Sequence, residues 1–458
     1  MSNLGTRENP LRAAIVGSGP AGFYAAEALI ESGPTLLVDM FERLASPFGL
    51  VRSGVAPDHP KLKQPILVYQ QIAESPQFRF LGNVTVGRDV SVPELKDCYH
   101  VVVFACGAQT DRAMGIGGEY LPGSRAATEF VGWYNGHPDY RDLVFDLSHD
   151  TAVIIGQGNV AVDVCRILAK TADELRHTDI AAHALEALAE SRIRDIHMIG
   201  RRGPAQAKFT HPELRELGEL ADCDPIVDPR DLELNAASCA ELADRSNRAA
   251  IKSYEVLQAF AARPPPTHRR RCHLDFLKSP IELIGDGRLE RLLLMRNCLV
   301  GQPSRQVAQA TGEMEELACG VLFRSIGYRG VAIAGVPFDE ARGVIPNRDG
   351  RVIDGENVVP GVYVTGWIKR GPTGIIGTNR EDSVLTVNSI LADLPHLDAG
   401  AKPGADRVMA LLEGRGTRVV SYADWQKIDA AEIRRGQPAA KPREKFTGLK
   451  EMLDVLEC

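Results

Sequence analysis

The stretch RAAIVGSGPAGFYAAEALI, residues 12–30, decides the fold class of this chain. A short apolar run from Ala13 to Val16 breaks at glycine and continues as an alanine-rich helical pattern, which predicts a strand, a tight turn and a helix. The turn carries Gly17-x-Gly19-x-x-Gly22. The first glycine allows the tight turn, the second lets a pyrophosphate approach the N–H groups of the helix N-terminus, and the third lets the helix pack on the strand. The stretch therefore predicts a dinucleotide-binding unit.

An acidic residue follows the next predicted strand. Leu36 to Phe41 has the apolar character of a buried strand, and Glu42 comes directly after it. A carboxylate at this position can accept hydrogen bonds from both ribose hydroxyls of the adenosine half of FAD or NAD. A glycine pattern alone could reflect simple turn chemistry, but the strand, the helix and the acid together favour dinucleotide binding.

A second unit of the same kind lies at residues 151–170, TAVIIGQGNVAVDVCRILAK. Val153 to Ile155 predicts the strand, and a helical pattern begins at Val160. The turn reads Gly156-Gln157-Gly158-Asn159-Val160-Ala161, in which alanine takes the place of the third glycine, a permitted variant. The chain thus holds two nucleotide-sized α/β units.

Two arginines stand where the second unit would often carry an acid. The apolar run from Ile196 to Ile199 precedes GRRGPAQAKFT, residues 200–210, with Arg201 and Arg202 at the predicted strand end. Guanidinium groups are planar, permanently charged donors that suit a phosphate dianion, so the pair predicts NADP, held by its 2′-phosphate, in preference to NAD. The alternative is a solvated pair of surface arginines, and the position after the strand argues against it.

A glycine-rich segment near residue 370 indicates a flavin site. In GWIKRGPTGIIGT, Trp367 follows a predicted buried strand and precedes Gly371, Gly374 and Gly377. Glycines let the backbone approach a flat ring system, and an indole offers a face or an N–H donor. A glycine-rich hairpin is equally compatible with this composition, but the presence of two dinucleotide units favours the flavin.

Two similar strand-then-glycine crossings, at about residues 107 and 328, indicate where the chain enters and leaves an inserted domain. We expect an α/β fold with two Rossmann-like dinucleotide-binding domains, the NADP domain inserted into a discontinuous FAD domain. The expected boundaries are 1–109 and 329–458 for the FAD domain and 110–328 for the NADP domain, with a C-terminal helical extension after about residue 400.

Composition excludes several classes of protein. A net charge of -7 and a pI near 5.9 argue against a broad nucleic-acid surface. The 9 cysteines include no C-x-x-C or C-x4-C pair, which removes the usual spacing of iron–sulfur, zinc-ribbon and dithiol sites, so we predict no metal centre. Scattered thiols, the absence of a signal-peptide pattern in MSNLGTRENP and the absence of a long apolar run predict a cytoplasmic protein with no membrane span.

Two candidate catalytic residues also have a structural interpretation. THPE, residues 210–213, has the form of a capping box with Thr210 as N-cap and Glu213 at N3, and this weighs about evenly with a cofactor role for Glu213. In APDHPKLK, His59 reads as a surface residue in the first turn of a helix capped by Asp58.

The whole set of motifs resembles the ferredoxin–NADP reductase family of the adrenodoxin-reductase type. The resemblance covers nearly the whole chain and rests on VGSGPAGFYAA, PFGLVRSGVAPDHPKLK, GQGNVAVDVCRIL, GRRGPAQAKFT, ELREL and GWIKRGPTGIIGTN. Of these, PFGLVRSGVAPDHP has no simple explanation in residue propensity and is a signature of the family. The resemblance implies FAD in the discontinuous domain, NADP in the insert and an iron–sulfur protein as electron partner.

Site residues implied by the resemblance fall at matching positions of this sequence. His59 and Glu213 would lie near the nicotinamide, where they would orient it or manage protons. The implied FAD contacts are Ala21, Glu42, Leu50, Val86, Trp367, Gly374, Ile375 and Ile376. The implied NADP contacts are Arg112, Gln157, Gly158, Asn159, Val160, Arg201, Arg202, Glu213 and Gly374.

The expected activity is hydride transfer from NADPH to FAD, followed by single-electron transfer to a ferredoxin. Two alternatives stay open: an NADPH-dependent flavin monooxygenase or oxidase, and a nucleotide-sensing or electron-input subunit of a larger complex. Because small ferredoxins are usually acidic, the partner site should be basic. RPPPTHRRR, with Arg263, Arg269, Arg270 and Arg271, is the candidate docking segment, and a solvated basic loop is the alternative.

Overall fold

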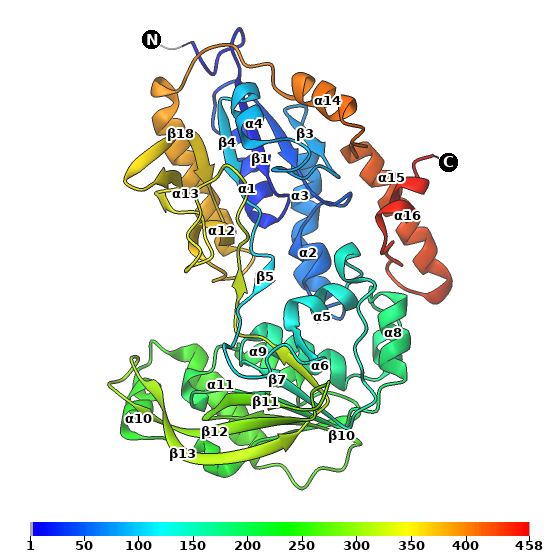
Figure 1. Ribbon diagram of the computed structural model, residues 1–458, viewed down its shortest axis with the longest axis vertical. Helices are drawn as coiled ribbons and strands as arrows, with labels where there is room; N and C mark the ends of the chain where they lie inside the picture. The colour runs from blue at the N-terminus through cyan, green and yellow to red at the C-terminus, as the bar shows by residue number, and fades with distance from the viewer. Residues whose placement is uncertain (1–2, 458) are drawn as a thin grey trace.

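Two separate sheets, each covered by helices, organise the computed structural model, which describes residues 3–457 (Figure 1). The first is a seven-stranded sheet in the order β16-β17-β18-β4-β1-β2-β3. Its strands are β1 (Leu11–Val16), β2 (Leu36–Phe41), β3 (Phe78–Leu81), β4 (Val101–Phe104), β16 (Asn347–Arg348), β17 (Arg351–Asp354) and β18 (Asn357–Val364). The strands from β18 to β3 are parallel, and β16 and β17 add an antiparallel edge.

The helices and turns associated with the first sheet come from both ends of the chain (Figure 1). They are α1 (Pro20–Ile30), α2 (Leu50–Ser53), η1 (Pro60–Lys63), α3 (Pro65–Ala73), α4 (Val92–Cys98), α12 (Trp367–Arg370), α13 (Thr378–Asp393) and η5 (Leu394–His396). A C-terminal extension follows, made of α14 (Ala405–Gly414), α15 (Tyr422–Gly436), η6 (Gln437–Ala439) and α16 (Leu449–Asp454).

The second sheet has six parallel strands in the order β6-β14-β7-β8-β10-β9. Its strands are β6 (Ser124–Ala126), β7 (Thr151–Ile155), β8 (Asp195–Ile199), β9 (Cys223–Ile226), β10 (Arg270–Asp275) and β14 (Val321–Arg324). Helices and turns in this part are α5 (Ala127–Tyr134), η2 (Pro138–Tyr140), α6 (Asn159–Ala169), α7 (Ala172–Leu175), α8 (Ala182–Ala189), η3 (Pro204–Gln206), α9 (His211–Glu216), η4 (Pro229–Leu232), α10 (Ala236–Ala243) and α11 (Arg248–Ala261). An antiparallel sheet of β11 (Lys278–Ile284), β12 (Arg291–Val300) and β13 (Val307–Ala318) packs alongside.

The two chain crossings between these parts lie together. β5 (Thr110–Asp111) pairs antiparallel with β15 (Tyr328–Arg329), with Gln109 N donating to Arg329 O at 3.0 Å. Figure 1 shows β5 between the upper part, coloured blue and yellow to orange, and the lower green part. The expected α/β fold is confirmed, with one dinucleotide-binding domain inserted into a discontinuous other. Within residues 3–457, no helix is both long and apolar enough to cross a membrane.

The apolar runs in the sequence form the buried strands of both sheets. β1 and β7 are apolar over almost their whole length, as expected of parallel strands that are covered on both faces. Ala161 of α6 is fully buried, so a small residue at that position lets the helix pack on β7.

Buried ionic groups join the C-terminal extension to both parts of the molecule. Glu432 of α15 is fully buried, and its carboxylate accepts hydrogen bonds from Arg52 at 2.6 and 2.9 Å. Lys445 lies 3.1 Å from Asp179 of the inserted part, which also pairs with Lys63 at 2.7 Å. The extension therefore links residues before β3 to the loop between α7 and α8.

Lys445 should make the stability of the protein pH-dependent. Burial, together with the charges of Lys63 and Arg52, lowers the pKa of Lys445 to about 7 despite the opposing effect of Asp179. A lysine in an unfolded chain titrates near a pKa of about 10.4. Between these values the unfolded state binds more protons, so rising pH should stabilise the folded protein by up to about 1.4 kcal/mol per pH unit.

The check is urea unfolding of wild type and Lys445→Met between pH 6.5 and 9.5. The wild type should gain stability relative to the variant as pH rises through this range, because the variant lacks the titrating group. Lys427→Met, at a side chain that is 63% exposed, is the control and should follow the wild type. Parallel profiles for wild type and Lys445→Met would contradict the prediction.

Candidate functional site

The first glycine turn leaves open space in front of a helix. Gly17 has φ +109, and a Cβ atom there would lie 2.6 Å from Ala105 O. A Cβ atom at Gly22 would lie 2.1 Å from Gly17 O, whereas none of the protein atoms lies within 4 Å of that position at Gly19. Gly19 is the N-cap of α1, so the opening leads to unpaired helical N–H groups. The turn has the shape required for a pyrophosphate.

Glu42 is held beside this turn, as the sequence predicts. Its Oε2 accepts hydrogen bonds from Ser18 N at 3.1 Å and Ser18 Oγ at 2.6 Å, and its Oε1 accepts one from Leu44 N at 3.0 Å. A carboxylate has about four acceptor positions. The Glu42 carboxylate can therefore still accept a hydrogen bond from a ribose hydroxyl.

The signature stretch PFGL closes over the same turn. Phe48 N donates to Ser18 O at 3.0 Å, and a Cβ atom at Gly49 would lie 2.9 Å from Gly19 Cα. Phe48 and Gly49 both have positive φ, which directs Leu50 to the start of α2, where it is partly exposed. The backbone conformation of this stretch is thus set by its contact with the glycine turn. Residue propensity, which acts only locally, therefore does not explain the sequence of the stretch.

The segment after Trp367 is a loop between two helices, so the alternative of a glycine-rich hairpin is wrong. Trp367 Nε1 donates to Thr373 O at 3.1 Å, and residues 374–376 lead into the 16-residue helix α13. The preceding Gly366 packs on α1, where a Cβ atom would lie 2.6 Å from Ala21 Cβ. At Gly377, the N-cap of α13, the Cβ position has no atom within 4 Å. A second open helix N-terminus, with its partial positive charge, therefore lies on the same side of the first sheet.

Two other predicted FAD contacts are accessible. Ile375 is 69% exposed in the loop before α13. Val86 is half-buried and packs against the core cluster that contains Val16 of β1 and Phe41 of β2.

The second glycine turn repeats the geometry of the first. Gly156 has φ +128, and a Cβ atom there would lie 2.1 Å from Ser325 O, whereas Gly158, the N-cap of α6, faces open space. The helix begins at Asn159, followed by a partly buried Val160. The Gln157 amide donates to Asp275 O at 2.8 Å and so ties the turn to the end of β10.

Arg201 and Arg202 follow β8, and the charge of Arg202 helps to lower the pKa of the Glu241 carboxyl without forming a close ion pair with it. Within residues 3–457, neither guanidinium has a carboxylate partner or a hydrogen-bond acceptor. Arg201 is exposed and Arg202 half-buried. Gly156 N donates to Ile199 O at 2.9 Å, which places the arginine pair at the same sheet edge as the glycine turn. Arg112 is exposed on the connecting ribbon, where its N donates to Gly327 O at 3.1 Å.

The structural interpretation of His59 and Asp58 is wrong. The His59 side chain is only 12% exposed, and Asp58 caps no helix. Asp58 instead pairs with Arg166 of α6 at 2.7 Å and with Lys170, the residue after α6, at 2.8 Å. Burial alone would raise the pKa of Asp58, but Arg166 and Lys170 hold it well below its usual range.

The capping box expected at Thr210 is also absent. The Thr210 side chain caps no N–H group, and Thr210 N donates to Asn159 Oδ1 at 2.8 Å. Glu213 Oε2 lies 3.8 Å from His59 Nδ1 and has no hydrogen-bond partner within the described chain. Burial and the Asp163 carboxylate raise the pKa of Glu213. The structure thus brings together the two predicted catalytic residues from distant parts of the chain.

Two residues at this junction were missed by the sequence analysis. Glu216 Oε2 lies 2.7 Å from His59 Nε2, closer than any atom of Glu213. Arg166 is 1% exposed, and its Nη2 lies 3.4 Å from His59 Nδ1. In ELREL, Glu213 and Glu216 are three residues apart and so lie on the same face of a helix, which could have indicated Glu216 as a site residue. Nothing in the sequence distinguishes Arg166 from a surface residue of an amphipathic helix.

The three side chains His59, Glu213 and Glu216 lie close enough to share one metal ion. Arg166 Nη1, however, is 3.6 Å from Glu213 Oε2 and 3.5 Å from Glu216 Oε2. This guanidinium already places a positive charge beside both carboxylates, and we assign no metal here.

The predicted docking segment does not form a free basic surface beside the cofactor turns. Arg270 is 5% exposed and donates to Ala169 O at 3.2 Å, so its inclusion is wrong. Arg271 is neutralised by Asp195 at 2.6 Å. Arg263 and Arg269 are exposed, but the segment precedes β10 and lies at the amino edge of the parallel sheet. The second glycine turn lies at the opposite, carboxyl edge.

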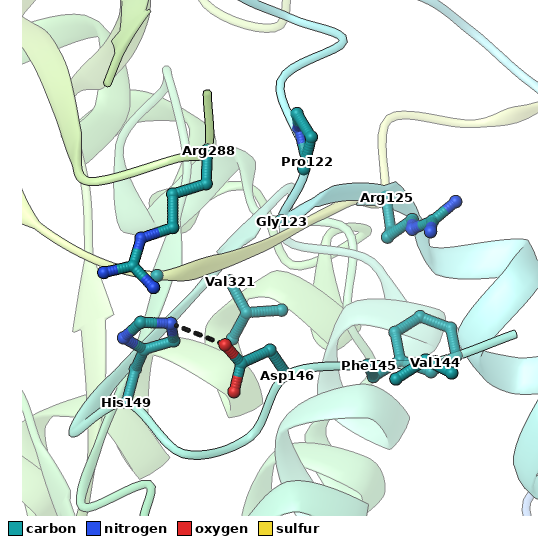
Figure 2. A pocket seen from close by; sticks show the side chains of 10 residues that line it. Pro122, Gly123, Arg125, Val144, Phe145, Asp146, His149, Arg288 and Val321 are labelled. Atoms are coloured by element: carbon teal, nitrogen blue, oxygen red, sulfur yellow. Dashed lines mark hydrogen bonds and ion pairs between the residues drawn. The ribbon is translucent and has the colours of Figure 1, made fainter. Parts of the chain in front are cut away.

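A pocket of about 260 Å³ opens at this same amino edge. Figure 2 shows Arg288 reaching beside His149, whose Nε2 lies 3.1 Å from Asp146 Oδ2. The residues that line the pocket lie at or just before the beginnings of β6, β7 and β14, together with Arg288. The pocket is therefore separate from the dinucleotide turns.

Comparisons with known proteins agree with this arrangement. Residues 11–199 match a family model described as pyridine nucleotide-disulphide oxidoreductase. The chain is 46% identical to NADPH-ferredoxin reductase FprA of Mycobacterium tuberculosis, over 97% of this chain and 99% of that protein. It is 46% identical to the mitochondrial NADPH:adrenodoxin oxidoreductase of Bos taurus, over 99% of this chain and 94% of the relative.

A solved structure gives the same result. The structure of Mycobacterium tuberculosis FprA in complex with NADPH superposes with a TM-score of 0.92 and covers 98% of this chain and 99% of that one, at 46% identity. The similarity extends over both sheets and the C-terminal extension. The chain belongs to the family of NADPH-ferredoxin reductases and NADPH:adrenodoxin oxidoreductases.

Proposed function

We propose that this protein is an FAD-dependent oxidoreductase that transfers electrons from NADPH to a ferredoxin-type iron–sulfur protein. The observation that carries the proposal is the pairing of two open glycine turns, one beside a fixed acid and the other beside two free arginines. Bound FAD would supply the redox chemistry, because a flavin accepts an electron pair as hydride and releases electrons singly. The protein supplies binding, orientation and the exclusion of competing reactions.

The first turn is proposed as the FAD site. Gly17, Gly19 and Gly22 admit the pyrophosphate to the N-terminus of α1, and Glu42 accepts a ribose hydroxyl. The N-terminus of α13 offers a partial positive charge to the flavin ring. The remaining proposed contacts are Ala21, Leu50, Val86, Trp367, Gly374, Ile375 and Ile376.

The second turn is proposed as the NADP site. Its pyrophosphate would bind at Gly156 to Val160, and its 2′-phosphate would bind between Arg201 and Arg202. Arg112, on the ribbon beside the turn, would add a third guanidinium. We also propose domain boundaries at this ribbon, with residues 110–328 as the NADP domain and residues 1–109 and 329–458 as the FAD domain.

His59 and Glu213 are proposed to hold the nicotinamide. The Glu213 side chain is 16% exposed, and Oε2 is its enclosed oxygen, so Oε1 would accept a hydrogen bond from the carboxamide N–H₂ group. His59 is fixed between Glu216 and Arg166 and can exchange a proton at Nδ1 or Nε2 without moving its ring. These residues bind and orient the nicotinamide, and none needs to form a covalent bond.

Two other functions need different chemistry. A flavin monooxygenase would hold an organic substrate over the flavin, and a sensing subunit would bind nucleotide without turnover. Membership of a family of NADPH-ferredoxin and NADPH:adrenodoxin reductases favours electron transfer to an iron–sulfur protein.

We further propose a reducing compartment, the cytoplasm, because the eight described cysteines are all free thiols.

The test is anaerobic stopped-flow reduction of the flavin by NADPH and by NADH, followed by coupling to ferredoxin and cytochrome c. NADPH should bleach the flavin band much faster than NADH, and cytochrome c should be reduced only when ferredoxin is present. A yellow protein whose flavin NADPH never bleaches would contradict the proposal. Electron transfer that produced an oxygenated organic product in air would favour the monooxygenase.

A further inference from the structure

Lys208 lies directly beside the second glycine turn. Lys208 N and Phe209 N both donate to Gln157 O, at 2.8 and 2.9 Å. Thr210 N donates to Asn159 Oδ1 at 2.8 Å. Residues 208–210 therefore run along the turn, and their position is fixed by it.

The Lys208 side chain is free to leave the protein surface toward a ligand. The backbone bends at Phe209, and the burial of the two neighbouring side chains differs sharply. Phe209 is buried in the core of the inserted part, and Lys208 is exposed. Among the described residues, the Lys208 ammonium has neither an ion-pair partner nor a hydrogen-bond acceptor.

Lys208 and the arginine pair occupy different positions relative to the cofactor. Arg201 and Arg202 follow β8, where the 2′-phosphate of the adenosine ribose would bind. Lys208 N is hydrogen-bonded to Gln157 O of the turn, one residue before Gly158, the N-cap of α6. A lysine acts on phosphate as a point charge on a flexible stem, which suits a pyrophosphate already bound by helical N–H groups.

We propose that Lys208 is an additional cofactor-binding residue that contacts the pyrophosphate of NADP(H). This inference rests on the proposed function, since it names a residue of the same NADP site. The cationic groups then have different roles, because Arg201 and Arg202 distinguish NADP from NAD, whereas Lys208 increases affinity for both.

Three ligands separate these roles. NADPH carries both the pyrophosphate and the 2′-phosphate, NADH carries only the pyrophosphate, and 2′-AMP carries only the 2′-phosphate. Equilibrium titration of purified FAD-loaded protein should show that Lys208→Met weakens NADPH and NADH by a similar factor, about tenfold, while 2′-AMP changes by less than about twofold. Arg201→Gln should do the reverse, weakening NADPH and 2′-AMP and leaving NADH nearly unchanged.

Two controls keep the result interpretable. Lys96→Met, at an exposed lysine of α4 outside the inserted part, should leave all three affinities unchanged. Lys208→Arg preserves the charge and should retain most of the affinity, which separates loss of charge from local unfolding. A loss of NADPH and 2′-AMP binding without a loss of NADH binding would overturn the proposal, as would unchanged binding of all three ligands to Lys208→Met. A wild type that binds NADPH no better than NADH would count against the proposed function instead.

Discussion

Replacing both Arg201 and Arg202 by glutamine should raise the Kd for NADPH by roughly 10²- to 10⁴-fold and leave the Kd for NADH nearly unchanged. The reason is that charge-assisted hydrogen bonds contribute about 1.5–3 kcal/mol each, and NADH has no 2′-phosphate to receive them. Within residues 3–457 neither guanidinium forms a close ion pair or a side-chain hydrogen bond, so replacing both should break no such contact.

The measurement is titration of both nucleotides, together with stopped-flow flavin reduction at saturating concentrations of each. The rate of flavin reduction at saturation should change little, because the arginines bind a part of the nucleotide that is remote from the reacting ring. Arg230→Gln, at an exposed arginine paired with Asp228, is a suitable control. Equal losses of NADPH and NADH affinity in the double variant would refute the assignment of the 2′-phosphate site.

Replacing Glu432 by alanine should destabilise the protein by about 3–5 kcal/mol. Removing one partner of a buried ion pair leaves the other charge buried and uncompensated, and that is what makes the loss large. Here the variant leaves the Arg52 guanidinium without its carboxylate partner, and the Arg52 side chain is only 8% exposed. The variant also removes the acceptor of the hydrogen bond from Phe446 N. The same carboxylate lies 3.4 Å from Arg443.

Urea unfolding followed by far-UV circular dichroism measures this loss. Arg52→Met combined with Glu432→Met should recover part of the stability, because the double variant leaves neither of the two charges alone. Lys450→Ala, which removes an exposed partner of Asp454, should leave the unfolding midpoint almost unchanged. A Glu432→Ala protein that unfolds at the wild-type midpoint would show that the extension is not held by this pair.

Most of the fold could be predicted because its signals are local. Leu36–Phe41 was predicted as a strand with the bounds that the structure has. Gly17 and Gly156 need positive φ and a close backbone approach, and both requirements are satisfied within one strand–turn–helix unit. The strand-then-glycine pattern also indicated the two chain crossings. It did not indicate that the crossings pair with each other as β5 and β15.

Two of the errors have the same cause: a charged side chain was given a local role, but a group distant in sequence binds it. Asp58 was expected to cap its own helix, but Arg166 of α6 and Lys170 after it bind Asp58 instead. Arg270 was expected to belong to a basic loop, but it enters β10 and is buried. A charged side chain goes to the partner that compensates its desolvation best, and that partner can lie anywhere in the sequence.

By itself, the sequence determined the two glycine turns, the parallel strands behind them and the arginine pair after β8. These features depend on backbone sterics and on the periodicity of apolar residues, both of which act over a few residues. Only the tertiary structure decided that His59 lies against Glu216 and Arg166, that Glu213 faces the same junction, and that Lys208 borders the second turn. Such contacts form between elements that are distant in sequence, so their geometry exists only once both domains have folded and packed together.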